Sequence, residues 1–243
     1  MFRSSNPFLK ASNFGSVQGV GAMTLSGTLG KVSVLLVLLL AGSVVGWTVH
    51  SMPLLVVGLI GSLGLGIWTS FSPKVSPYTA PAYAVFEGLL VGTISVIYAQ
   101  SMAGTKYAGA VPLAVLGTLV VFAVMLFLYA TRIIKVGNTF VAVVAGATAA
   151  IGLTYLFTLL GGIFFKGLYS MPIYQASPIG IGFSAFVIVV AALNLALDFK
   201  MIEDGTNARA PKFMEWYASF GLLVTLVWIY LEMLRLLSKL SRR

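Results

Sequence analysis

The sequence predicts an all-α membrane protein, a bundle of seven transmembrane helices, on three observations. Of the 243 residues, 59% are hydrophobic and only 9% are charged, whereas soluble domains carry about a quarter charged residues. The mean hydropathy is +1.00. Apolar runs of about 20 residues, enough to cross roughly 30 Å of hydrocarbon, recur with short connections between them. No stretch is left over for a soluble domain.

The apolar runs divide the chain into three parts. Residues 1–30 are polar, rich in Gly and Ser, and basic, and we expect a flexible cytoplasmic tail there, since no signal-peptide cleavage site follows the first apolar run. Residues 31–238 form the transmembrane domain, and residues 239–243 form a basic C-terminal tail. The seven predicted spans are 32–50, 53–71, 79–101, 109–131, 137–162, 178–199 and 213–237.

The basic residues between the spans predict the orientation of the protein. If the N-terminus is cytoplasmic, the inner connections carry six basic residues and the outer connections carry two, which follows the positive-inside rule. The inner six are Lys74, Arg132, Lys135, Lys200, Arg209 and Lys212, and the outer two are Lys106 and Lys166. The basic C-terminal tail favours the opposite side. An alternative topology therefore has six spans and a re-entrant last segment that returns the tail to the inside.

Glycines in the third span predict close helix packing. Gly88 and Gly92 form a GxxxG pattern. In lipid, helices associate through close approach of their backbones, because no hydrophobic force drives them together. We expect these glycines to face a neighbouring helix of the same chain, with contact between copies in an oligomer as the alternative.

The positions of the six acids indicate where a functional site lies. Glu87 lies two turns into the third span, Asp198 in the last turn of the sixth, and Glu215 in the first turn of the seventh. The connectivity of the spans places these three carboxylates at similar depths, near one membrane face. Glu203 and Asp204 are expected as solvated charges in the connection that follows the sixth span.

Glu232 lies 17 residues after Glu215, which is about 25 Å along a helix. It therefore belongs to the opposite mouth of the bundle.

Carboxylates at this depth predict a site that responds to ions and protons. Acidic residues within a membrane are costly, and they usually mark ion or proton paths. Two or three carboxylates that lie close together cannot all be ionised near neutral pH, which suggests pH sensing. Asp198 and Glu87 would also suit a hard cation such as calcium, which prefers oxygen ligands. Asn194, one turn before Asp198, extends the polar stripe into the membrane.

Simpler structural roles are the alternative for these residues. Glu87 could make a structural hydrogen bond to Tyr83, Ser95 or a neighbouring helix, and Asp198 could be a solvated helix end. Other classes of protein find little support. The chain has no cysteine, one histidine (His50), no HExxH or GxSxG motif, and no lysine in mid-membrane for retinal. We therefore expect neither an enzyme nor a cofactor. The net charge of +9 indicates contact with anionic lipid headgroups, and not with nucleic acid.

Three stretches resemble the Bax inhibitor (transmembrane Bax inhibitor motif) family in its bacterial branch. They are FEGLLVGTIS (86–95), LNLALDFKMIEDG (193–205) and APKFMEWYASFGLLVTLVWIYLEMLRLL (210–237). The resemblance covers residues 28–240. It implies seven helices with the seventh in a central position, a calcium leak across the bacterial inner membrane, and gating by two aspartates at the ends of the sixth and seventh helices.

Asp198 matches the first aspartate of that pair, while the second has no clean match. Aligning the closing LRLL of the seventh span places Thr225 there, and the local Tyr-Leu-acid pattern selects Glu232. Glu215 is a physically reasonable substitute at another position. The sequence thus leaves the partner of Asp198 open among these three residues.

The leading functional hypothesis is a pH-sensitive, calcium-permeable channel or leak, with Asp198 and Glu87 at the inner mouth and with calcium and protons as its ions. A second hypothesis is a regulator that conducts no ion and binds a membrane protease or stress protein. A third is a proton-coupled transporter.

Overall fold

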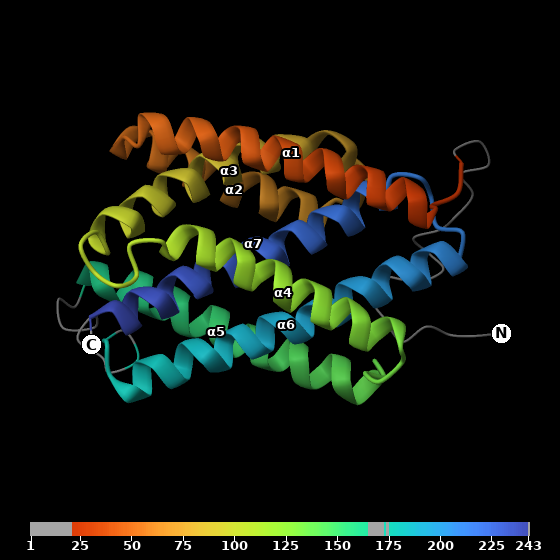
Figure 1. Ribbon diagram of the computed structural model, residues 1–243. Helices are drawn as coiled ribbons and strands as arrows, with labels where there is room; N and C mark the ends of the chain where they lie inside the picture. Colours follow the sequence, from red (N-terminus) through yellow and green to blue (C-terminus); the bar gives the residue numbers. More distant parts are fainter. Residues whose placement is uncertain (1–20, 165–172, 174, 243) are drawn as a thin grey trace. The chain divides into compact units, whose positions relative to one another are not determined.

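The computed structural model describes residues 21–164, 173 and 175–242. Seven of its helices are long and apolar enough to cross a membrane, as the sequence predicts (Figure 1). They are α1 (Leu25–Val49), α2 (Met52–Phe71), α3 (Ser76–Ser101), α4 (Ala110–Ala130), α5 (Asn138–Phe164), α6 (Pro178–Asn207) and α7 (Met214–Ser241), with a short 3₁₀ helix, η3 (Pro73–Val75), before α3. The chain is an integral, multi-pass membrane protein.

Three helices extend at one end by at least four residues beyond the spans that the hydropathy predicts. α1 begins at Leu25, inside the predicted flexible tail, because the Thr24 side chain caps it by accepting a hydrogen bond from Gly27 N at 3.0 Å. α6 continues to Asn207, eight residues beyond its predicted end. α7 continues to Ser241, so residues 239–241 are helical and do not belong to a tail. This uninterrupted α7 of 28 residues favours the seven-span prediction over a re-entrant last segment.

The extension of α6 corrects two expectations. Asp198 lies nine residues before the end of the helix, so it is not in the last turn, and Glu203 and Asp204 are helical and not part of a loop. Asp204 forms an ion pair with Lys200 at 3.0 Å. The i,i+4 spacing of this pair stabilises the helix. Hydropathy misses this part of α6 because the helix continues where its surface turns polar.

The described residues form two compact units, which we call unit 1 and unit 2. Unit 1 comprises residues 21–94 and 198–224, and unit 2 comprises residues 95–197 and 225–242. Both α6 and α7 contribute one part to each unit. Most of the acids discussed above fall in unit 1.

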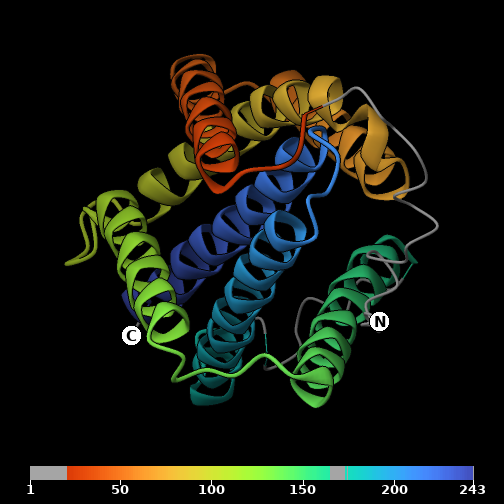
Figure 2. The same cartoon turned by 90° about the vertical axis from the view of Figure 1, so that its right-hand side faces the viewer.

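In unit 1, α3 packs closely against α1, and the two helices run side by side (Figure 2). Gly88 lies against the backbone of Leu39 and Gly42, and Gly46 lies against the Leu89 carbonyl, so the GxxxG of α3 faces α1 as expected. Thr93 Oγ1 adds a hydrogen bond of 3.3 Å to Gly46 O. An apolar cluster that includes Leu35, Tyr83 and Phe220 joins α1 and α3 to α7.

In unit 2, α5 packs through side chains. Ile151 of α5 is buried against Val187 and Val190 of α6, with Trp228 of α7 beside them. Asn194 of α6 donates a hydrogen bond of 2.7 Å to Thr148 Oγ1 of α5.

Candidate functional site

Asp198 faces α7 at Gly221. A Cβ placed on Gly221 would lie 3.4 Å from Asp198 Oδ1, in ordinary van der Waals contact. The Asp198 carboxylate therefore lies next to the α7 backbone at Gly221. Asp198 itself is half-buried. The helix-end position expected from the sequence is replaced by a position between two packed helices of unit 1.

Glu87 is buried on α3, with 7% of its surface exposed. Ser62 of α2 and Tyr83, one turn earlier on α3, are its side-chain hydrogen-bond partners. The Tyr83 ring meets Phe220 edge to face, with ring centroids 4.9 Å apart. Because Phe220 precedes Gly221, this ring contact connects the surroundings of Glu87 with the segment of α7 that Asp198 faces. Two of the three structural partners expected from the sequence, Tyr83 and a neighbouring helix, are thus found at Glu87.

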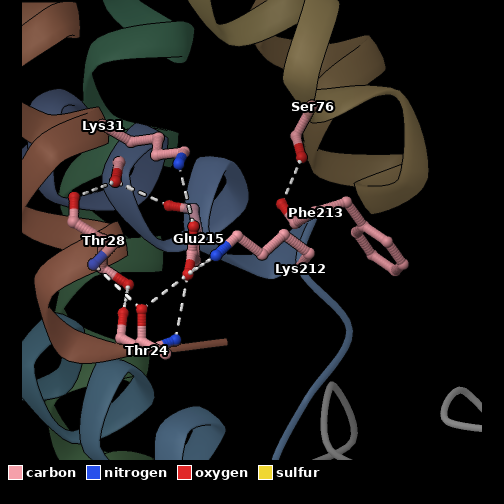
Figure 3. Close-up of polar contacts among 9 residues, drawn as sticks. Thr24, Thr28, Lys31, Ser76, Lys212, Phe213 and Glu215 are labelled. Atoms are coloured by element: carbon pink, nitrogen blue, oxygen red, sulfur yellow. Dashed lines mark hydrogen bonds and ion pairs between the residues drawn. The ribbon is translucent and has the colours of Figure 1, made fainter. Parts of the chain in front are cut away.

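Glu215 is fully buried at the start of α7 and is surrounded by donors (Figure 3). Its Oε1 accepts hydrogen bonds from Thr24 N and Thr24 Oγ1, both at 3.0 Å. Lys212 Nζ lies 3.2 Å from the same oxygen, and Lys31 Nζ lies 3.0 Å from Oε2. The Glu215 carboxylate therefore joins the start of α7 to the first turn of α1.

Glu87, Asp198 and Glu215 all belong to unit 1, but they do not form one metal-binding group. Among the described residues, no three acidic or histidine side chains gather where they could hold a metal ion. Glu215 is engaged by two lysines and Thr24 in place of a second carboxylate. A calcium ion at Asp198 and Glu87 remains a prediction.

The other three predicted site residues belong to unit 2. Glu232 Oε2 accepts hydrogen bonds from Tyr155 Oη at 3.0 Å and from Arg235 Nη1 at 2.8 Å. Asn194 bonds to Thr148, and its amide also donates to Val190 O, so it helps to hold α5. Thr225 is buried. On α7, Gly221 lies next to Asp198 Oδ1, and the partner of Asp198 among Glu215, Thr225 and Glu232 stays a prediction.

Several residues around these carboxylates were not among the predicted site residues. Lys212 stands three positions before Glu215, so their pairing was readable from the helical period. Lys31 and Thr24 are distant in sequence, and no periodicity indicates their contact. Lys239, expected in the tail, is 5% exposed and donates to Ile173 O, Gly180 O and Ser184 Oγ, each at 2.8 Å.

Seven membrane-length helices and carboxylates held between them define a polytopic α-helical membrane protein. The chain belongs to the Bax inhibitor 1 like family, whose model matches residues 6–242, nearly its whole length. That family is not a family of enzymes. A comparison with curated proteins gave no match.

Proposed function

We propose that the protein is a pH-sensitive, calcium-permeable leak of the Bax inhibitor type, in the bacterial inner membrane with its N-terminus in the cytoplasm. The observation that carries the proposal is the position of Asp198, half-buried in a membrane-length helix and directed at Gly221 of α7. A carboxylate at such a depth is costly in lipid and usually serves an ion or proton path.

The chemistry of Asp198 supports both parts of this function. When ionised, the carboxylate offers the oxygen ligands that calcium prefers. When protonated, it loses the charge that attracts a cation, and it can pack against the α7 backbone as a neutral group. Glu87 supplies a second buried carboxyl group in the same unit, and Ser62 and Tyr83 orient it. Calcium is then a passing ion and not a tightly held one, since the described residues lack a cluster of three ligands.

Exchange of the Asp198 charge tests the proposal. Purified protein is reconstituted into liposomes that contain a calcium-sensitive dye, and calcium entry is followed from mildly acidic to mildly alkaline pH. The wild type should show a flux that depends on pH. Asp198→Asn keeps the size of the side chain but cannot titrate, so its flux should no longer depend on pH.

Asp204→Asn is the matched control, because Asp204 lies on the same helix and makes an ion pair with Lys200 at its surface. It should behave as the wild type. A wild-type flux whose pH dependence survives Asp198→Asn contradicts the role of Asp198. Wild-type liposomes that take up no calcium at any pH contradict the leak itself, and favour a regulator that conducts no ion.

A further inference from the structure

The residues just before α1 form a short segment that we call the strap (residues 21–24). The strap is not helical, yet it lies against the connection between α6 and α7 (Figure 2). Ala22 forms an antiparallel bridge with Pro211, and Met23 N donates a hydrogen bond of 2.7 Å to Ala210 O. Thr24 is held by Glu215 through two hydrogen bonds (Figure 3). Three successive residues of the strap thus contact the α6–α7 connection or the start of α7.

Met23 inserts its side chain between the ends of α6 and α7. It is 2% exposed, and its cluster contains Ile202 of α6 and Met214, Tyr217 and Ala218 of α7. A Cβ on Gly205 would lie 2.8 Å from Met23 Sδ, closer than real Cβ atoms approach a neighbour. Because Gly205 has no side chain, the Met23 sulfur can lie directly against α6.

The residues around Met23 lie on the same helix faces as Asp198 and Gly221. On α6, Ile202 and Gly205 follow Asp198 by four and seven positions. On α7, Gly221 follows Ala218, Tyr217 and Met214 by three, four and seven positions. These spacings keep side chains on one face of a helix. We call this contact between the two faces the α6–α7 seam; it runs from Met23 to Asp198 over about 10 Å.

We propose that Met23 is a plug at the end of the α6–α7 seam, and that Glu215 holds the plug in place through the strap. This inference rests on the proposed function, because it assigns a gate to the path that leads to Asp198. An ion that moves along the seam between the membrane face and Asp198 must displace the Met23 side chain. Methionine suits this task because its unbranched side chain is flexible.

The strap can move without separating α1 from α3. It is anchored by the Ala22–Pro211 bridge, the Met23 N hydrogen bond, the Met23 side chain and Glu215, whereas the middle of α1 is fixed separately through Gly42, Gly46 and Leu35. Segments with few contacts open at a lower free energy than a packed core. Release of the strap therefore exposes the seam while α1 and α3 stay together.

Truncation of the plug tests the proposal in the full-length protein. Met23→Ala should raise calcium flux several-fold, because the seam loses its filling side chain. Met23→Leu keeps the volume and should leave the flux close to that of the wild type. Met102→Ala is the matched control, since Met102 is also fully buried but lies in unit 2, and it should leave the flux unchanged.

A second readout does not depend on flux. The chain contains no cysteine, so Ile202→Cys introduces a single thiol into the seam, and its reaction with a charged thiol reagent measures access. Labelling should be slow with Met23 or Leu at position 23 and several-fold faster with Ala. Glu215→Gln keeps the plug but loses the two ion pairs that hold it, so it should also speed labelling, by a smaller factor.

The two readouts separate failure of the plug from failure of the leak. If the wild type takes up no calcium, the proposed function fails, and the labelling rates alone decide on the plug. Equal labelling of the Ile202→Cys protein in the wild-type, Met23→Ala and Glu215→Gln backgrounds overturns the plug. So does a wild-type flux that Met23→Ala leaves unchanged.

Discussion

In unit 1, the α1 and α3 backbones touch at Gly42, Gly46 and Gly88, and little space separates the two helices. In unit 2, two glycines of α5 have no such neighbours, since nothing lies within 4 Å of a Cβ placed on Gly146 or Gly152. There, Thr148, Ile151 and Tyr155 hold α5 instead. Lipid supplies no hydrophobic force between helices, so other contacts must hold the helices together, and these contacts differ between the two units. Unit 1 uses close backbone packing, and unit 2 relies more on side-chain contacts.

The buried carboxylates of α7 differ between the units in the number of donors that surround them. Glu215 in unit 1 has two lysines and both donors of Thr24 around it. Glu232 in unit 2 has Tyr155 and Arg235 on Oε2. One oxygen of each carboxylate, Glu215 Oε2 and Glu232 Oε1, is buried without a hydrogen bond, but Glu215 Oε2 has Lys31 Nζ at 3.0 Å. The first carboxylate is surrounded by donors on the side of α1, and the second depends on two. Removing one of the groups that contact the carboxylate should therefore lower the free energy of unfolding more in unit 2 than in unit 1.

The largest expected effect comes from adding a methyl group to the backbone contact of unit 1. In Gly88→Ala, the new Cβ would overlap Leu39 O, so α1 and α3 must separate. We expect a loss of about 3 kcal/mol in the free energy of unfolding, the upper end for overpacking. Gly146→Ala, in open space on α5, should stay within about 1 kcal/mol of the wild type, on the stabilising side. Unfolding in detergent micelles with increasing dodecyl sulfate measures both; equal losses would contradict the difference between the units.

The helices and the glycine contact of unit 1 could be predicted from the sequence, because each depends on a periodic or length-limited signal. Hydropathy located all seven spans, since a span needs a fixed length of apolar chain. It missed the ends of α6 and α7, where the helices continue into polar sequence. The GxxxG pattern placed Gly88 at a helix contact because small residues allow close approach.

The partners of the acids could not be predicted from the sequence. Counting residues along the spans placed Glu87, Asp198 and Glu215 at one depth, and the structure puts all three in unit 1. Which side chain a carboxylate faces depends on the rotation of each helix, which neither hydropathy nor charge pattern encodes. Thr24, Lys31 and Gly221 were missed for this reason. Met23 was missed because it lies outside any helix, where periodicity has no meaning.

An intermediate effect should follow from removing one cation in each unit. Arg235→Met removes one of the two hydrogen-bond donors to Glu232, and it also removes a cation–π contact in which the guanidinium lies 4.7 Å from the centre of the Tyr155 ring. Breaking a buried pair costs about 3–5 kcal/mol. We expect about 2 kcal/mol here, because the Arg235 side chain is 33% exposed and part of the loss is therefore screened by solvent.

Lys31→Met is the matched change in unit 1. Glu215 keeps Lys212 and both donors of Thr24, so the loss should be about 1 kcal/mol or less. The same unfolding assay compares the two variants. A larger loss for Lys31→Met than for Arg235→Met would mean that the number of donors does not decide how a buried carboxylate responds.

The smallest expected effect separates Asn194 from Asp198, which stand one turn apart on α6 but belong to different units. Asn194 bonds to Thr148 across the α5–α6 contact, and such bonds between membrane helices contribute about 1 kcal/mol. Asn194→Ala should therefore lower the free energy of unfolding by that amount and leave the pH dependence of calcium flux intact. Asp198→Asn should remove the pH dependence of calcium flux and leave the free energy of unfolding close to that of the wild type. If Asn194→Ala also removed the pH dependence, the assignment of titration to Asp198 alone would be wrong.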